Sequence, residues 1–331
     1  MKALVYTATR RVEFRDEPEP EPGNEKVIVR VSACGICGSD MHGYHGEDPR
    51  RVPPLILGHE AIGVAETGRY AGRQVVVNPL MTCGECDACR SGRTNLCNSR
   101  ELIGIRVPGA FAERVTILER NLLPLPAGLD PLAAALTEPA ACAVHAVAKV
   151  AKCIFRPINE ARALVLGGGA IGVLSAYVLR SHGCDEIALG DPSRVRRGTI
   201  DRLGIADTYD PGEGEPPAAG SYDIVIDAVG SGNTREAASR SVAPGGVVAH
   251  IGLQDSGPGF DTRRATLQEI TFLGSYTYSV ADFAATLQLL ARGALAGDLS
   301  WVEQRALVEG PGAFADLDQA KTPACKIVLV P

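Results

Sequence analysis

The sequence predicts an α/β protein that joins a β-rich domain with long loops to a doubly wound parallel sheet. The first observation is the texture of residues 33–123, which are punctuated by glycine and proline and hold only short strand-like segments. The second is the alternation, after residue 160, of continuous apolar runs with helical segments at the spacing of βαβ units. Continuous apolar runs are expected where a parallel sheet is covered on both faces.

The length of the chain and two changes of texture predict the domain boundaries. At 331 residues the chain exceeds what a single core usually supports, so two domains are expected. An alanine-rich helical stretch at 132–150 separates the loop-rich part from the βαβ part. We assign residues 1–145 and 280–331 to the β-rich domain and residues 146–279 to the parallel-sheet domain.

The individual elements follow from local patterns. Residues 1–14 read as a strand pair with a turn near Thr9 and Arg10, and short strands are expected at 26–31, 74–77 and 111–117. In the sheet domain the expected strands are 161–167, 186–191, 222–230, 247–252 and 272–277. Helices are expected from the glycine-rich turn to His182, over 193–203 and over 234–242. A helix with apolar spacing at Phe283, Leu287 and Leu290 then leads to a final strand at 326–331.

Composition excludes several classes of function. The formal net charge is −6, and no basic run is present, which argues against a nucleic-acid surface. No uninterrupted apolar stretch reaches the ~18 residues that a membrane span needs. Ten cysteines in a chain without a leader-like N-terminus favour a reducing cytoplasm, with thiols that bind metal or are buried.

Four cysteines form the most specific local motif. They follow the pattern C-x2-C-x2-C-x7-C, at Cys83, Cys86, Cys89 and Cys97. Four soft thiolates on one loop can close a tetrahedral shell around Zn²⁺ and leave no open position, which predicts a structural zinc lobe. A pair of disulfides is the alternative, and the spacing and the expected compartment disfavour it.

A glycine-rich turn predicts a dinucleotide site. Gly167, Gly169 and Gly172 form G-x-G-x-x-G directly after an apolar strand and at the start of a helix. Gly167 allows the tight turn, Gly169 lets the backbone approach a pyrophosphate, and Gly172 allows close packing of helix on strand. The free amides at the helix start, which include those of Ala170 and Ile171, favour phosphate.

The next strand carries the residue that selects the cofactor. Asp191 ends that strand, 19 residues after Gly172, where a carboxylate accepts hydrogen bonds from the ribose hydroxyls and repels a 2′-phosphate. We therefore expect NAD rather than NADP. Arg194, Arg196 and Arg197 follow closely, and an arginine there can accommodate a 2′-phosphate; solvated helix surface is the other interpretation. Arg196 is kept as a cofactor-binding candidate.

A second group of possible metal ligands is spread along the chain. Cys37 and His59, together with a carboxylate, offer sulfur, nitrogen and oxygen from separate loops, as in an open three-ligand zinc site. Cys34 and Cys37 also form a C-x-x-C, but no helix of thioredoxin type follows, so we expect Cys34 to face the strand core.

The order of these motifs resembles that of the zinc-dependent medium-chain dehydrogenase/reductase superfamily, and most closely its polyol (sorbitol-like) dehydrogenase branch. The shared motifs are G-I-C-G-S-D-x-H, G-H-E, the four-cysteine lobe, E-P-x-x-x-x-x-H-A and G-x-G-x-x-G, and they span nearly the whole chain. The resemblance implies a Rossmann domain, a GroES-like catalytic domain, NAD, two zinc ions per chain and a homo-oligomer, either a tetramer or a dimer.

The resemblance also implies roles for single residues. Cys37, His59 and Glu138 would bind the catalytic zinc, and Glu60 would lie beside them or ligate transiently. Ser39 would take the substrate proton, and His42 would pass it onward by way of the cofactor ribose. Alcohol dehydrogenases of the same superfamily have a second cysteine at the position of Glu138, so the glutamate favours the polyol branch.

One departure bears on the substrate. Polyol enzymes carry an arginine where this chain has Thr277, so a ring or short-chain polyhydroxy substrate is expected in place of sorbitol. A 2,3-diol, a threonine-like amino-alcohol or an aminocyclitol are alternatives for the same chemistry. A non-catalytic NAD-binding scaffold is the alternative from another class, and the intact set of candidate catalytic residues disfavours it.

Overall fold

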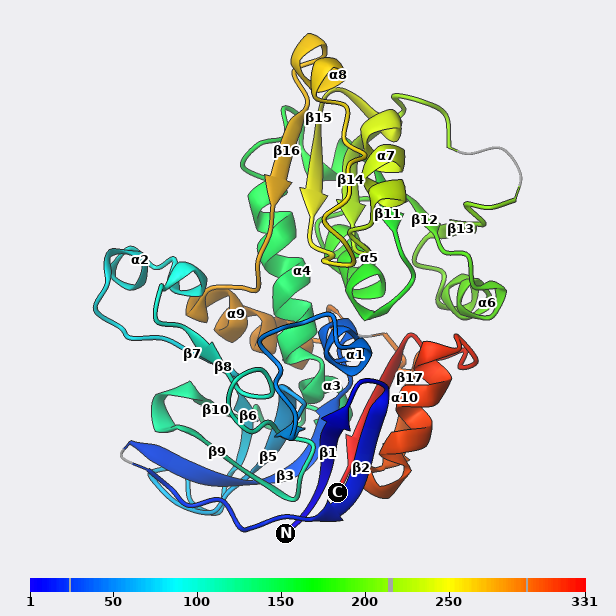
Figure 1. The fold of residues 1–331 in the computed structure, drawn as a ribbon. Helices are drawn as coiled ribbons and strands as arrows, with labels where there is room; N and C mark the ends of the chain where they lie inside the picture. Colours follow the sequence, from blue (N-terminus) through cyan, green and yellow to red (C-terminus); the bar gives the residue numbers. More distant parts are fainter. Residues whose placement is uncertain (24, 214–216, 296) are drawn as a thin grey trace.

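The computed structural model describes residues 1–23, 25–213, 217–295 and 297–331. A parallel sheet forms one end of the molecule and a group of antiparallel strands the other, with both chain termini at the antiparallel end (Figure 1). A small lobe that contains α2 (Asp87–Arg90) projects to one side between the two.

The parallel sheet has the strand order β13-β12-β11-β14-β15-β16. This is the strand order of the dinucleotide-binding fold. Successive strands are added outward on one side of β11 and then on the other, and ligands bind at the carboxyl ends of the strands where that order switches. The strands are β11 (Arg162–Leu166), β12 (Glu186–Gly190), β13 (Asp207–Tyr209), β14 (Tyr222–Asp227), β15 (Val242–His250) and β16 (Thr271–Gly274).

Helices cover both faces of this sheet, which confirms the doubly wound prediction. Ala163 and Val165 of β11 pack in the cluster that contains α4 (Thr137–Val150) and α5 (Ala170–Ser181). The alternate residues of the same strand, Leu164 and Leu166, pack with Ala238 of α7 (Gly232–Ser241). Every β11 residue from 163 to 166 is therefore buried, as the continuous apolar run predicts.

The antiparallel end is built from two main sheets, ordered β2-β1-β4 and β10-β6-β5-β3-β18-β17, with β9 also paired to β3. Their strands are β1 (Lys2–Ala8), β2 (Arg11–Asp16), β3 (Lys26–Gly35), β4 (Leu55–Ile56), β5 (Glu60–Ala65), β6 (Gln74–Val77), β9 (Arg114–Leu118), β10 (Leu122–Pro124), β17 (Val302–Ala306) and β18 (Lys326–Val330). The C-terminal strand β18 pairs antiparallel with β3, so both ends of the chain complete this part.

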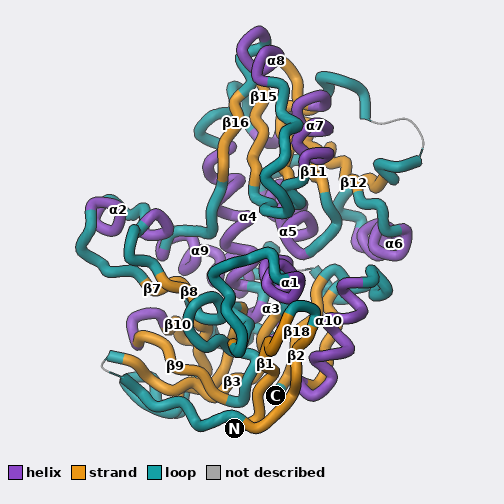
Figure 2. The backbone as a smooth tube through the Cα atoms, viewed as in Figure 1, coloured by secondary structure: helices purple, strands orange, loops and turns teal. Residues whose placement is uncertain are grey.

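The remaining elements are short or connect these sheets (Figure 2). They are α1 (Gly38–His45), α3 (Pro131–Ala135), α6 (Arg194–Leu203), α8 (Thr262–Leu267), α9 (Val280–Ala291), α10 (Gly310–Asp318), β7 (Leu80–Met81), β8 (Glu101–Leu102), η1 (Thr94–Leu96), η2 (Glu119–Asn121), η3 (Ile158–Glu160) and η4 (Leu307–Glu309). Among the described residues, no helix combines the length and the apolar character that crossing a membrane demands.

The structure differs from the predicted elements in two places. The alanine-rich stretch 132–150 is two helices, α3 and α4, divided at Leu136, so that Glu138 falls in the first turn of α4 and not in the middle of a helix. The expected strand 247–252 forms the end of β15, which is not an edge strand because β16 pairs beside it.

Candidate active site

A group of possible metal-ligand atoms lies where the end of β3 meets the start of β5. The ligand atoms of Cys37, His59 and Glu60 all lie within 4.8 Å of one another. Strand pairing explains this, because Gly35 at the end of β3 stands opposite Glu60 at the start of β5. Cys37 caps α1, and its Sγ accepts a hydrogen bond from the Ser39 amide at 3.5 Å. The pairing of the two strands therefore brings together residues from two distant motifs.

The site holds two buried glutamates, Glu60 of this group and Glu138, and they have different partners. Glu60 forms an ion pair with Lys326 of β18, and the Lys326 ammonium also donates to the Ile36 carbonyl at 2.9 Å. Glu138 lies outside the 4.8 Å group, and its Oε1 accepts a hydrogen bond from the Tyr278 hydroxyl at 2.9 Å. Burial raises the pKa of the Glu138 carboxyl to about 7. Glu60 thus faces a cation, whereas Glu138 faces a neutral phenol.

Asp40 supports the histidine of the cluster. Asp40 is fully buried; its Oδ1 lies 3.5 Å from His59 Nδ1, and its Oδ2 accepts from the Cys37 amide at 3.0 Å. Although burial disfavours the imidazolium, this carboxylate raises the pKa of His59 well above its usual value. A thiol, an imidazole and two carboxylates, all held in fixed orientations, are a donor set that suits zinc.

The residues expected to move the proton lie on α1. Ser39 Oγ accepts a hydrogen bond from Arg51 Nη2 at 3.1 Å. Arg51 is buried, and its other groups donate to Asp48 at 2.5 Å and to the Gly104 carbonyl at 3.1 Å. The arginine thus fixes the position of the serine hydroxyl.

His42 occupies the next turn of α1, three residues after Ser39. Its Nδ1 lies 3.2 Å from Glu47 Oε2 near the surface. On a helix, residues three apart share a face. The relay from Ser39 to His42 therefore remains a prediction that the helix geometry allows.

The four-cysteine lobe forms a second group of ligands. The ligand atoms of Cys83, Cys86, Cys89 and Cys97 also lie within 4.8 Å of one another. Cys83 Sγ is 3.9 Å from Cys89 Sγ and 3.5 Å from Cys97 Sγ. All four thiols are free, so the disulfide alternative is not found, and four thiolates at these separations fit a closed zinc site.

The glycine turn has the geometry its sequence predicts. Gly167 adopts φ 101°. A Cβ on Gly172 would stand 1.8 Å from the Gly167 carbonyl oxygen, so the close packing of the helix on the turn leaves no room for a side chain there. A Cβ on Gly169 would meet nothing within 4 Å. The surface in front of Gly169 is therefore open, as a phosphate group requires, at the N-terminus of the α5 helix, where Ala170 and Ile171 begin the first turn.

Asp191 has a structural function that the sequence did not suggest. The carboxylate is buried and accepts from the Gly168 amide at 2.7 Å and from the Ser193 amide at 2.8 Å. The hydrogen bond to the Gly168 amide thereby holds the glycine turn in position. Arg196 Nη1 lies 4.0 Å from the same carboxylate, and its Nε is buried with no hydrogen-bond partner among the described residues. The side chain of Arg196 is thus turned toward the cofactor turn and not into solvent.

Sequence reasoning missed Lys326, Arg51 and the role of Tyr278. The available signals were weak: Lys326 is a lone cation that opens an apolar strand, and Arg51 stands beside a second arginine in a loop. Thr277, by contrast, is unusual in the structure. It is β-branched yet adopts φ 46°, and its Oγ1 is buried without a hydrogen-bond partner in the described part of the chain. Cys34 is buried in the core cluster, as expected.

Comparisons with known proteins agree with this geometry. Residues 23–127 match the family model of the alcohol dehydrogenase GroES-like domain, and residues 170–292 match that of the zinc-binding dehydrogenases. The chain is 31% identical over 312 residues to the L-galactonate-5-dehydrogenase of Escherichia coli, with 90% of each chain covered. It is 34% identical over 309 residues to a sorbitol dehydrogenase of Halalkalibacterium halodurans, with 88% of each covered.

A solved structure gives the same picture for the fold. A chain from Sinorhizobium meliloti, solved with NADP bound, is 30% identical and superposes with a TM-score of 0.88. The alignment covers 100% of this chain and 99% of that chain. Both the antiparallel end and the parallel sheet are therefore shared.

Proposed function

The chain belongs to the zinc-dependent medium-chain dehydrogenases, in the polyol dehydrogenase branch, and we propose that it transfers a hydride between NAD(H) and a secondary alcohol of a polyol, cyclitol or sugar. The observation that carries the proposal is the grouping of Cys37, His59 and Glu60 beside Ser39, in a chain that also holds a glycine turn open to phosphate. A scaffold without catalysis has no need of both.

We propose Cys37, His59 and Glu138 as the ligands of the catalytic zinc. Glu60 is nearer to the other ligand atoms, but its charge is already balanced by Lys326. Glu138 accepts its hydrogen bond from Tyr278 and forms no ion pair within the described residues, and a buried carboxylate is stabilised by a positive neighbour. Glu60 then lies beside the metal, where it can replace Glu138 as ligand.

When zinc and NAD⁺ are both bound, the zinc would polarise the alcohol oxygen and the nicotinamide would accept the hydride. The residues of the chain handle the proton. Ser39 accepts it at an oxygen lone pair that Arg51 leaves free and, in the same step, releases its own hydroxyl proton toward His42. His42, one turn along α1, passes it toward solvent. Asp40 holds His59 in one orientation throughout.

We propose that NAD is preferred, with Asp191 and Arg196 deciding. Both Asp191 oxygens accept amide hydrogen bonds, yet a carboxylate oxygen has a second lone pair for a ribose hydroxyl. Replacing Asp191 by Ser keeps a small acceptor and removes the charge. Asp191→Ser should lower the NAD/NADP preference at least about tenfold in kcat/KM. An unchanged ratio, or a parent protein that prefers NADP, would assign the selection to Arg196 instead.

We also propose a homo-oligomer that pairs through β16. This strand is one of the two edges of the parallel sheet, and Phe272 on it is exposed. An exposed strand edge with an aromatic side chain favours pairing with a symmetry-related copy. Light scattering across the micromolar range should give a dimer or tetramer, and a monomer throughout would exclude this arrangement.

The proposed activity is tested with a panel of polyols, cyclitols, 2,3-diols and threonine, supplied with NAD⁺ and followed by NADH absorbance. Turnover is expected for substrates whose secondary alcohol has a neighbouring hydroxyl, and primary alcohols should be poor. Zinc analysis of the same preparation should give two ions per chain. One zinc ion per chain and no turnover with any alcohol would favour a scaffold.

A further inference from the structure

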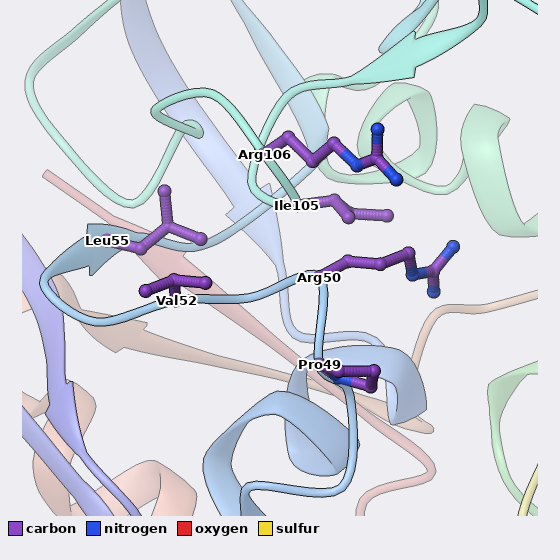
Figure 3. Close-up of a pocket in the computed structure, with 6 residues that line it drawn as sticks. All are labelled: Pro49, Arg50, Val52, Leu55, Ile105 and Arg106. Carbon is purple, nitrogen blue, oxygen red and sulfur yellow. The ribbon is translucent and has the colours of Figure 1, made fainter.

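A cavity of about 570 Å³ opens at the segment that follows α1. Its lining comes from the loop between α1 and β4, from the first residue of β4, and from the loop between β8 and β9 (Figure 3). The lining residues are Pro49, Arg50, Val52, Leu55, Ile105 and Arg106. The volume lies in the range typical of small-molecule sites.

The cavity is connected to the catalytic residues through one buried contact. Arg51 Nε donates to the Gly104 carbonyl at 3.1 Å, and these two residues are chain neighbours of Arg50 and Ile105 in the lining. This contact joins the two loops. The same guanidinium donates to Ser39 Oγ at 3.1 Å. The buried side chain of Arg51 therefore links the loops that carry the cavity wall to the proposed proton acceptor.

Two guanidinium groups face the same side of the cavity. Figure 3 shows the side chains of Arg50 and Arg106 extended in the same direction, with Ile105 between them. Arg50 is paired with Asp48 at 2.8 Å and keeps 42% of its side chain exposed. Arg106 is exposed, and within the described residues it has no acidic partner. Arg106 is therefore a solvent-accessible cation that is available to bind an anion.

Asp48 does not neutralise this group of arginines. Its carboxylate accepts from both Arg50 and Arg51, so one negative charge is shared between two positive ones. Asp40, the next carboxylate, is buried, and its Oδ1 lies 3.5 Å from both His59 Nδ1 and Arg51 Nη2, so it offsets charge on Arg51 and not on Arg106. Arg50 also lies against the Tyr276 hydroxyl, which adjoins Thr277. Positive charge therefore reaches the part of the site where Thr277 replaces the arginine expected in polyol dehydrogenases, but from a different loop.

We propose that this cavity binds a terminal anionic group of the substrate, so that the alcohol oxidised is a polyhydroxy acid or a sugar phosphate. Arg106, with Arg50 beside it, would hold the anion, since planar guanidinium groups match carboxylate and phosphate oxygens. The hydroxyl-bearing chain then runs past Ser39. This inference rests on the proposed dehydrogenase function and names its substrate class.

The test compares substrates that differ only at one end. Each aldonate is paired with the alditol of the same stereochemistry, and each alditol 1-phosphate with the same alditol. The parent protein is expected to show a higher kcat/KM for the anionic member of at least one pair. Arg106→Gln should lower the ratio of anionic to neutral kcat/KM about 10- to 100-fold. Arg106→Lys, which keeps the charge without the planar fork, should fall in between.

A matched control separates a local effect from net charge. Arg263 on α8 is also exposed and forms no ion pair in the described part of the chain, and α8 lies at the far end of the parallel sheet (Figure 1). Arg263→Gln removes the same charge and should leave the anionic-to-neutral ratio unchanged. Raising ionic strength should raise KM for the anionic substrate only, because partly exposed ion pairs are screened.

Two outcomes overturn the inference while the dehydrogenase function stands: neutral alditols that are oxidised as well as or better than their anionic partners, or equal losses for Arg106→Gln and Arg263→Gln. Failure to oxidise any alcohol with NAD⁺ or NADP⁺, with zinc present, overturns the proposed function itself. Preference for aldonate or for phosphate identifies the anion.

Discussion

The two cysteine-containing clusters of this protein reach similar ligand separations by different routes. In the lobe, all four sulfurs come from residues 83–97, and three of the four cysteines are only partly buried. At the proposed catalytic centre, Cys37 precedes α1 and is partly buried, whereas His59 before β5 and Glu138 in α4 are buried. The lobe is a local structure, whereas the catalytic centre exists only when distant strands pair.

This difference predicts different sources of stability. A loop that carries four thiolates has little core of its own, so its metal supplies the folding energy. The catalytic centre is held by hydrogen bonds and ion pairs of the chain itself, among them those of Asp40, Arg51 and Lys326. We therefore expect the fold of the proposed catalytic centre to depend less on its metal than the fold of the lobe does.

The largest effect is expected from removing the thiol of Cys37, a proposed ligand of the catalytic zinc. Cys37→Ala should lower kcat at least about 1,000-fold, because the zinc loses a charged ligand. The lobe is independent, so one zinc ion per chain and NAD binding should remain, measured by metal analysis and calorimetry. Cys97→Ala is the matched variant in the lobe and should lose its zinc with partial unfolding. Comparable turnover in Cys37→Ala and the parent would remove Cys37 from the catalytic centre.

Removing the buried ammonium tests whether charge balance supports the catalytic centre. Lys326→Met leaves Glu60 as an uncompensated buried carboxylate and should lower the free energy of unfolding by about 3–5 kcal/mol. Chemical denaturation of the zinc-loaded protein measures this. Lys321 is exposed, and Lys321→Met should change stability by less than about 0.5 kcal/mol. Equal stability of the two variants would show that the ion pair contributes nothing net.

Chelation should distinguish the two metals by rate. The catalytic ion has an open coordination position, so we expect it to leave at least about tenfold faster than the ion of the closed lobe. Zinc release to a coloured chelator should be biphasic, with activity lost in the fast phase. The Cys37→Ala protein should lack the fast phase. A single phase, or activity lost with the slow phase, would contradict the assignment of the two sites.

The smallest effect concerns acid stability near the catalytic centre. Burial disfavours the Asp48 carboxylate, but hydrogen bonds from Arg50 outweigh it and lower the pKa to about 2, from an ordinary value of 3.8. A lowered folded-state pKa adds stability above pH 4 that disappears as the pH falls toward 2. Between pH 5 and pH 3 the parent should lose up to about 1 kcal/mol more than Asp48→Asn. Denaturation of both proteins at the two pH values measures this, and equal losses would exclude it.

Much of the fold was predictable because its signals are local. The glycine turn, the apolar runs of β11 and β14 and the four-cysteine spacing each lie within one short segment. The stretch 132–150 is helical as predicted, but its division at Leu136, which places Glu138 at a helix start, was not predicted. The strand order of the sheet depends on pairing between segments far apart in sequence, which local patterns do not give.

The sequence by itself determined the residue types that can bind zinc and a dinucleotide, because cysteine spacing and glycine positions constrain the backbone directly. Only the tertiary structure decided which charges meet. Pairing of β18 with β3 brings Lys326 to Glu60, and the loop before β4 carries Arg51 to Ser39. Such contacts form between residues that local propensity does not relate. Burial then fixes them, since an ionised group removed from water must find its partner within the fold.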